Sequence, residues 1–103
     1  MNPEVLILYS RKECCLCQTL EKKLSSICLE KLKPSIALSI VDIDSKKVSL
    51  GIQKKYTNEV PVIVLDSNRL LKKIELPRVS PRLKEDMLLS WIQKNLNILY
   101  KKA

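Results

Sequence analysis

Three of the four cysteines of this chain, Cys14, Cys15 and Cys17, stand within four positions in the stretch RKECCLCQ. Clustered cysteines bind a metal, form structural disulfides or act as a redox pair. The chain has no His, which excludes an imidazole zinc site, a catalytic triad and a His general base. It has a single Gly, which excludes a glycine-rich phosphate loop. The cysteines are therefore the main candidates for chemistry.

Cys14 and Cys17 form a C-x-x-C pair between an apolar run and a segment with helical periodicity. A helix N-terminus carries partial positive charge and unpaired N–H groups, and both stabilise a thiolate, which is the reactive form of cysteine. Arg11 and Lys12 add positive charge just upstream, and Glu13 opposes them. We predict that Cys14, at the turn, is the attacking thiol and that Cys17, one helical turn further on, is the more shielded resolving thiol.

The other two cysteines are predicted to play lesser roles. Cys15 is interpreted as filling the variable position between the pair, with a regulatory or metal-binding role as the alternative. Cys28 lies eleven residues after Cys17, which is roughly 16 Å along a continuous helix and too far for a disulfide. We expect it to be a small buried apolar residue. The trio supplies fewer than the four ligands of a closed zinc site, although a cluster shared between two chains stays open.

The first half of the chain predicts two strands and two helices. Residues 4–9 are a continuous apolar run, typical of a strand covered on both faces. A helix is predicted from Cys15 to about Leu29, with its apolar face formed by Leu16, Leu20, Leu24 and Ile27. Residues 35–44 alternate as a second strand does, and Ser45 is the expected cap of a short helix with Val48, Ile52 and Tyr56 facing inward.

The second half predicts a hairpin and a final helix. Residues 60–66 form a buried strand, a turn follows at Ser67 and Asn68, and residues 69–76 return as the hairpin partner. Ser80-Pro81 is the expected helix start, with Ser at the cap and Pro at the first position. The apolar side of that helix comprises Leu83, Met87, Leu88, Trp91, Ile92 and Leu96.

The element order is therefore β-α-β-α-β-β-α, in one domain over residues 1–103. The first strand–helix–strand unit should be right-handed and parallel. The sequence predicts an α/β fold in which a four-stranded mixed sheet is flanked by helices on both faces.

The charge and hydropathy of the chain argue against a nucleic-acid partner and against a membrane. The formal net charge is +8, but the Lys residues come as scattered pairs on every predicted element, and aromatic residues are few, so a solvated basic surface is favoured over a nucleic-acid site. No apolar run approaches the roughly 20 residues of a membrane span, and we expect no membrane partner. The N-terminal stretch lacks the basic start of a signal peptide. We expect the protein to be cytoplasmic, where thiols are kept reduced.

The stretch LILYSRKECCLCQTLEKKL, followed by Val60-Pro61 at the head of the third strand, resembles the thioredoxin superfamily. It is most similar to small glutaredoxin-like proteins with a Cys-x-Leu-Cys active site. The resemblance implies a thioredoxin-like fold, a nucleophilic Cys14 and a resolving Cys17. It also implies that Arg11 supports the thiolate and contacts glutathione. Pro61 would be cis, and the backbone of Val60 would bind an extended substrate as an added strand.

The resulting hypothesis is a small thiol–disulfide oxidoreductase that acts on disulfide-containing protein substrates. It needs no dissociable cofactor, because the electrons reside in the cysteine pair. Glutaredoxins hold glutathione with a glycine pair after the hairpin, but the corresponding stretch LPRVSPRLKED has no Gly, so we expect weak use of glutathione. The alternative is a non-catalytic binding module on the same fold, which holds a metal or cluster or acts as a redox-sensitive adaptor.

Overall fold

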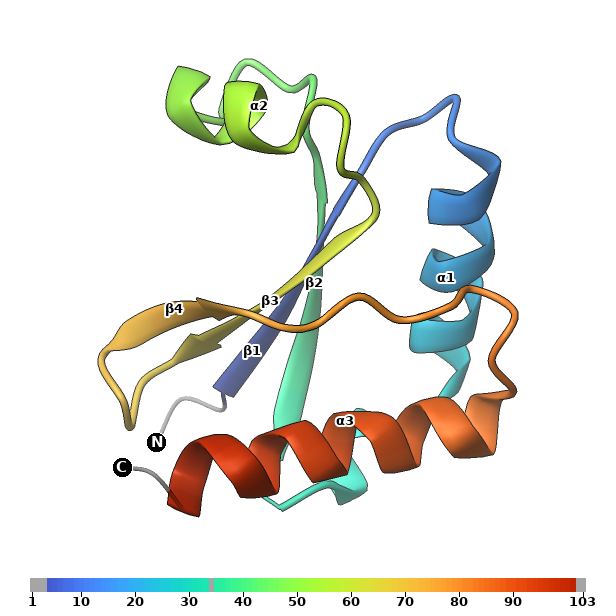
Figure 1. Cartoon of the computed structure of the whole chain (residues 1–103), viewed down its shortest axis with the longest axis vertical. Helices are drawn as coiled ribbons and strands as arrows, with labels where there is room; N and C mark the ends of the chain where they lie inside the picture. The colour runs from blue at the N-terminus through green and yellow to red at the C-terminus, as the bar shows by residue number, and fades with distance from the viewer. Residues whose placement is uncertain (1–3, 34, 102–103) are drawn as a thin grey trace.

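The computed structural model describes residues 4–33 and 35–101. Its four strands form one sheet in the order β2-β1-β3-β4, with β1 and β2 parallel and the other pairs antiparallel (Figure 1). The elements are β1 (Glu4–Ser10), α1 (Cys15–Ser26), the short 3₁₀ helix η1 (Leu29–Lys31), β2 (Ile36–Asp42), α2 (Leu50–Tyr56), β3 (Val62–Ser67), β4 (Lys72–Glu75) and α3 (Glu85–Lys101). This confirms the predicted element order and the mixed sheet of a thioredoxin-like fold.

Helices cover the sheet on both faces, as predicted. Leu6 and Leu8 of β1 point into the core on the side of α1 and α3, and both are fully buried. Ile7 and Tyr9 alternate to the opposite face, where they pack with residues of α2 such as Tyr56. A strand whose two faces are both buried needs apolar residues at every position, which explains the continuous apolar run.

The first helix, α1, is shorter than expected, and the set of residues on its buried face differs from the prediction. It ends at Ser26, and Ile27 is already extended. Its inward positions are Cys17, Leu20 and Leu24, spaced three and four residues apart, so Leu16 falls outside this stripe and is 56% exposed. The prediction that Leu16 belongs to the core face was therefore wrong.

The elements around the second helix also differ from the prediction. Ser49, not Ser45, caps α2, and its Oγ accepts a hydrogen bond from the N–H of Ile52 (3.3 Å). Ser45 instead opens a turn, in which its carbonyl accepts from the N–H of Val48 (3.1 Å). In β2, Ile40 is 39% exposed because this strand lies at the edge of the sheet.

The predicted hairpin is present, with a longer turn. Four residues, 68–71, connect β3 to β4, and Leu71 adopts a left-handed conformation (φ 55°). The hairpin strands, Val62–Ser67 and Lys72–Glu75, are both shorter than expected.

The last helix begins at Glu85, so the predicted start at Ser80-Pro81 was wrong. The Nζ of Lys23 donates hydrogen bonds to the carbonyls of Pro81 and Leu83, which a helix starting at Ser80 would use for its own backbone bonds. The buried face of α3 is formed by Leu88, Ile92 and Leu96 as expected, but Met87 is 54% exposed.

Candidate active site around Cys14 and Cys17

Cys14 is the N-cap of α1, at the end of the short turn that follows β1. The N–H of Cys14 donates to the carbonyl of Arg11 (3.1 Å), which closes the turn. The N–H of Cys17 donates to the Sγ of Cys14 (3.2 Å), and the N–H of Gln18 donates to its carbonyl (3.0 Å). One of the unpaired N–H groups of the first helical turn is thus aimed at the sulfur, where it stabilises negative charge. This placement confirms the predicted position of Cys14 at a helix start, and its role as the attacking thiol stays a prediction.

Cys17 lies directly behind Cys14 and has no exposed surface. Burial raises the pKa of the Cys17 thiol to about 12, and its hydrogen bond with Cys14 and the charge of that residue add to the effect. The backbone and charge of Arg11 act in the opposite direction and are outweighed. Cys17 is therefore a neutral thiol at neutral pH, held against the partly exposed Cys14.

The two remaining cysteines are both exposed. For Cys28 this corrects the prediction of a buried apolar residue. The reason is that α1 ends at Ser26, so Cys28 stands at the N-cap position of the following 3₁₀ helix and not on the inward face of α1. Over the residues that the structure describes, no group of three or more His, Cys, Asp or Glu side chains is placed to hold a metal ion.

The Val60-Pro61 peptide bond is cis, as the resemblance implied. The N–H of Val60 donates to the carbonyl of Tyr56 (3.2 Å), an internal bond that a substrate strand would have to replace. Beside Pro61 lies a cavity of about 330 Å³ between the end of α2, the start of β3 and the segment after β4. An ion pair between Arg78 and Glu59 joins the two sides of this cavity.

Tyr56 and Glu75 also line this cavity. Burial raises the pKa of Tyr56 to about 12, and its hydrogen bond to Glu75 and the negative charge there contribute to the increase. Tyr56 therefore stays a neutral hydroxyl that donates to the carboxylate of Glu75. The cavity thus presents both charged and apolar groups next to the cis-proline.

The side chain of Arg11 binds residues in the loops that follow β2 and α2. Its guanidinium binds the carboxylate of Asp44 (Nε to Oδ2, 2.9 Å) and both the carbonyl and the hydroxyl of Thr57 (3.0 Å each). The hydrogen bond with Asp44 raises the pKa of Arg11. Neither of these partners was singled out from the sequence.

A signal for the Asp44 contact was nevertheless present. β1 and β2 are parallel and in register, with Ser10 opposite Asp42. The carboxyl ends of parallel neighbours meet at one edge of the sheet, so the residue after β1 and the acidic VDID segment that ends β2 had to lie close together.

A family model described as "Glutaredoxin-like domain (DUF836)" matches residues 5–93, which include the cysteine pair and Pro61. The chain belongs to this glutaredoxin-like family. A solved structure described as "Structure of a malarial protein" is 22% identical, with a TM-score of 0.58 over 90% of this chain and 97% of that one, and it supports the fold. None of the curated proteins matches the chain.

Within the glutaredoxin-like domain, the segment between β4 and α3 has no Gly and two Pro residues, Pro77 and Pro81. Lys23 of α1 fastens it through the carbonyls of Pro81 and Leu83, and the hydroxyl of Ser26 donates to Glu85 at the start of α3 (2.7 Å). This segment is thus tied to α1 and contains no glycine turn.

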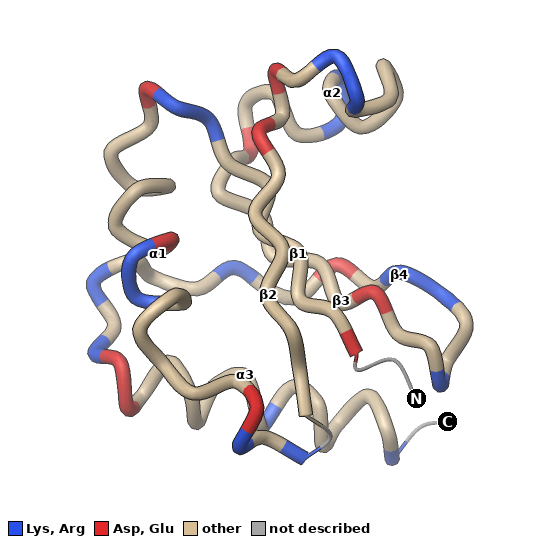
Figure 2. The backbone as a smooth tube through the Cα atoms, turned by 180° about the vertical axis from the view of Figure 1, so that it is seen from behind, with Lys and Arg blue, Asp and Glu red and all other residues tan. Residues whose placement is uncertain are grey.

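Lys and Arg residues lie on α1, α2, β4 and α3 and in the segment before α3, often beside acidic residues (Figure 2). Over the part of the chain that the structure describes, they form no single stripe along one element. Among the described residues, no helix is both long enough and apolar enough to cross a membrane.

Proposed function

We propose that this glutaredoxin-like protein is a thiol–disulfide oxidoreductase that reduces disulfides in protein substrates, with Cys14 as nucleophile and Cys17 as resolving thiol. The observation that carries the proposal is the asymmetry of the pair. Cys14 is partly exposed and receives an N–H hydrogen bond on its sulfur, whereas Cys17 is buried and held as a neutral thiol.

The reaction then follows in two exchanges. The thiolate of Cys14 attacks one sulfur of the substrate disulfide, a mixed disulfide forms, and the departing substrate sulfur takes a proton from water. Cys17 then loses its proton to solvent and attacks the Sγ of Cys14. The Cys14–Cys17 disulfide forms and the second substrate thiol leaves. Two electrons have passed to the substrate, and a cellular dithiol or thiol reductase returns them to the pair.

The raised pKa of Cys17 orders these steps. The charge of Cys14 and its hydrogen bond help to keep Cys17 protonated while Cys14 is a free thiolate. Once Cys14 is bonded to substrate, its negative charge is gone, and ionisation of Cys17 becomes easier. Cys17 is thus prepared to attack after the mixed disulfide has formed and not before.

Substrate would lie across Pro61 and the neighbouring cavity of about 330 Å³. The cavity offers cations from Lys55 and Arg78 and carboxylates from Glu59 and Glu75, so a side chain of either charge, or a peptide amide, finds a partner there. Because the segment after β4 offers no glycine turn, we expect glutathione to be a poor electron donor. The pair acts as a reductant only where thiols are kept reduced, so the proposal includes a cytoplasmic location.

The test is disulfide exchange with single cysteine variants. Cys14→Ser should abolish reduction of a protein disulfide, such as that of insulin, with dithiothreitol as the reductant. Cys17→Ser should retain the first attack and accumulate mixed disulfides, visible by mass spectrometry. Cys28→Ser is the matched control, since it removes an exposed thiol outside the pair, and should keep full activity.

Two results would contradict the assignment. One is an active Cys14→Ser variant whose activity disappears in Cys15→Ser, which would make Cys15 the nucleophile. The other is purification with a stoichiometric metal and a charge-transfer absorption band that requires Cys14 and Cys15, which would favour a metal-binding module.

A further inference from the structure

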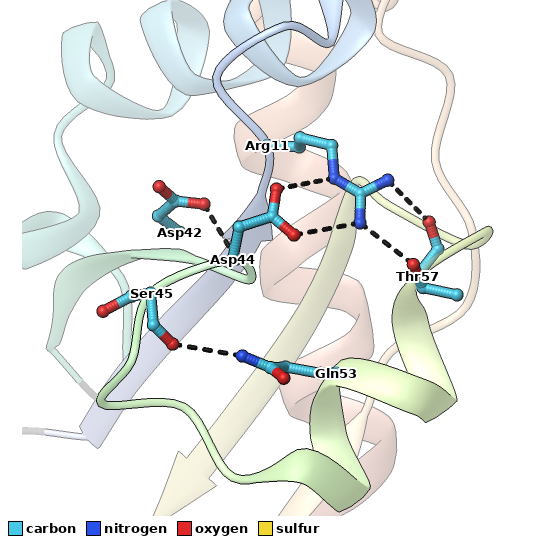
Figure 3. A network of polar contacts seen from close by, with 6 residues as sticks. All are labelled: Arg11, Asp42, Asp44, Ser45, Gln53 and Thr57. Atoms are coloured by element: carbon cyan, nitrogen blue, oxygen red, sulfur yellow. Dashed lines mark hydrogen bonds and ion pairs between the residues drawn. The ribbon is translucent and has the colours of Figure 1, made fainter.

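The guanidinium group of Arg11 is almost fully occupied by partners within the protein (Figure 3). Nε and one terminal nitrogen bind the two oxygens of Asp44 (2.9 and 3.2 Å). The terminal nitrogens also bind the carbonyl and the hydroxyl of Thr57, each at 3.0 Å. Four of the five N–H donors of an arginine are therefore in use. A substrate carboxylate could make a forked contact with this group only by displacing one of these partners, because a single N–H donor is left.

The partners of Arg11 are themselves held in place (Figure 3). The backbone N–H of Asp44 donates to the carboxylate of Asp42 (2.9 Å), and the carbonyl of Ser45 accepts from the amide of Gln53 in α2 (3.2 Å). A single ion pair at a half-exposed position contributes little to stability. A forked contact between an arginine and a carboxylate, held within a hydrogen-bond network, also fixes the relative orientation of the groups that it joins.

These contacts join the two loops on which the proposed chemistry depends. Arg11 stands three residues before Cys14, and its carbonyl closes the turn that presents Cys14 to the helix start. Thr57 is the C-cap of α2 and precedes the cis-proline Pro61 by four residues. The side chain of Arg11 thus connects the dithiol turn to the proline loop, and it also contacts Asp44, two residues after the end of β2.

We propose that Arg11 is a positioning residue that fixes the dithiol turn relative to the Pro61 loop, and that it is not a ligand for substrate carboxylates. This inference rests on the proposed function, because it assigns Arg11 a part in that reaction. It replaces the expectation that Arg11 contacts glutathione. It follows that the enzyme should not select anionic disulfides through this residue.

The two roles of Arg11 predict different outcomes with three small disulfides that differ in charge. Dithiodiglycolate is anionic, bis(2-hydroxyethyl) disulfide is neutral and cystamine is cationic. If Arg11 positions the loops, Arg11→Lys lowers kcat/KM for all three by a similar factor, because Lys keeps the charge but cannot make the forked contact. We expect a factor of roughly two to ten, the range that corresponds to loss of one hydrogen bond.

Thr57 provides a matched pair of variants. Thr57→Val removes the hydroxyl with little change of shape, whereas Thr57→Ser keeps it. Thr57→Val should lower kcat/KM for all three disulfides by about as much as Arg11→Lys does. Thr57→Ser should keep the kcat/KM of the wild type. Lys12→Gln, which alters an exposed neighbouring cation outside the network, is the control for a general effect of charge and should affect the neutral disulfide least.

Hydrogen exchange tests the connection without relying on catalysis. Arg11→Lys should speed amide exchange both in residues 11–14 and in residues 57–60, and Lys12→Gln should change neither segment. If Arg11→Lys slows only the reaction of dithiodiglycolate, or leaves exchange at 57–60 unchanged, the inference is overturned. A wild-type protein that reduces neither these three disulfides nor insulin would contradict the proposed function instead, and the exchange data would still decide whether Arg11 joins the loops.

Discussion

The burial of Cys17 leads to a prediction about the order in which the cysteines react. When the reduced, folded protein is treated with excess iodoacetamide at pH 8, we expect Cys14, Cys15 and Cys28 to be alkylated and Cys17 to be spared. In guanidinium chloride all four should react. The structure supplies the reason, because Cys17 has no exposed surface and a raised pKa, whereas Cys15 and Cys28 are exposed.

The size of the effect follows from two opposing terms. A pKa of about 12 in place of the ordinary 9.0 lowers the thiolate fraction at pH 8 about a thousandfold. The remaining thiolate is more basic and hence roughly twentyfold more nucleophilic, because reactivity rises with about the 0.4–0.5 power of basicity. The first term is larger, so the raised pKa alone should make Cys17 react roughly thirty- to sixtyfold more slowly than a thiol of ordinary pKa, before its burial is counted.

The assay is peptide mass spectrometry of a time course, with Cys28 as the internal reference thiol. Cys14→Ser provides a second check, since it removes the thiolate charge that helps to raise the pKa of Cys17, and it should accelerate alkylation of Cys17 while burial keeps it slower than Cys28. Alkylation of Cys17 in the folded wild type at the rate of Cys28 would refute the reasoning and the assignment of a shielded resolving thiol with it.

Further predictions concern stability. Leu8→Ala should lower the free energy of unfolding by about 2–5 kcal/mol in urea titrations, because Leu8 is fully buried between the helices and the sheet. Burial raises the pKa of Glu4, but hydrogen bonds from Ser67, Tyr100 and two backbone N–H groups bring it below 4.5. The ionised Glu4 therefore stabilises the fold fully above about pH 4.5, and this stabilisation is lost as the pH falls through the lowered pKa. Glu4→Gln should make the melting temperature depend less on pH between pH 5 and 2. Tyr56 and Cys17 have raised pKa values, so they stabilise the fold fully below about pH 9 and progressively less as the pH rises toward 12; Cys17→Ala should weaken this alkaline loss in thermal melts.

The sequence alone determined the order of the elements and the location of the reactive pair. Two patterns are local properties of the chain: continuous apolar runs, which indicate buried strands, and apolar residues repeated on one side, which indicate helices. Together they placed Cys14 at a helix start. The cis peptide before Pro61 was also expected, although on family resemblance and not on local physics. The predicted end of α1 and start of α3 were wrong, because these boundaries depend on which partners the terminal backbone groups find.

Only the tertiary structure decided what surrounds each of these residues. The start of α3 moved to Glu85 because Lys23, some sixty residues earlier in the chain, takes two of the carbonyls that an earlier start requires. Cys28 is exposed, contrary to the prediction, because α1 stops at Ser26, whereas Cys17 lies on the buried face of α1 and is shielded as predicted. Arg11 acquired its partners from residues more than thirty positions away. Contacts at such separation leave no periodic trace in the sequence, since they depend on the register of strands and the crossing of elements and not on the neighbours of each residue along the chain.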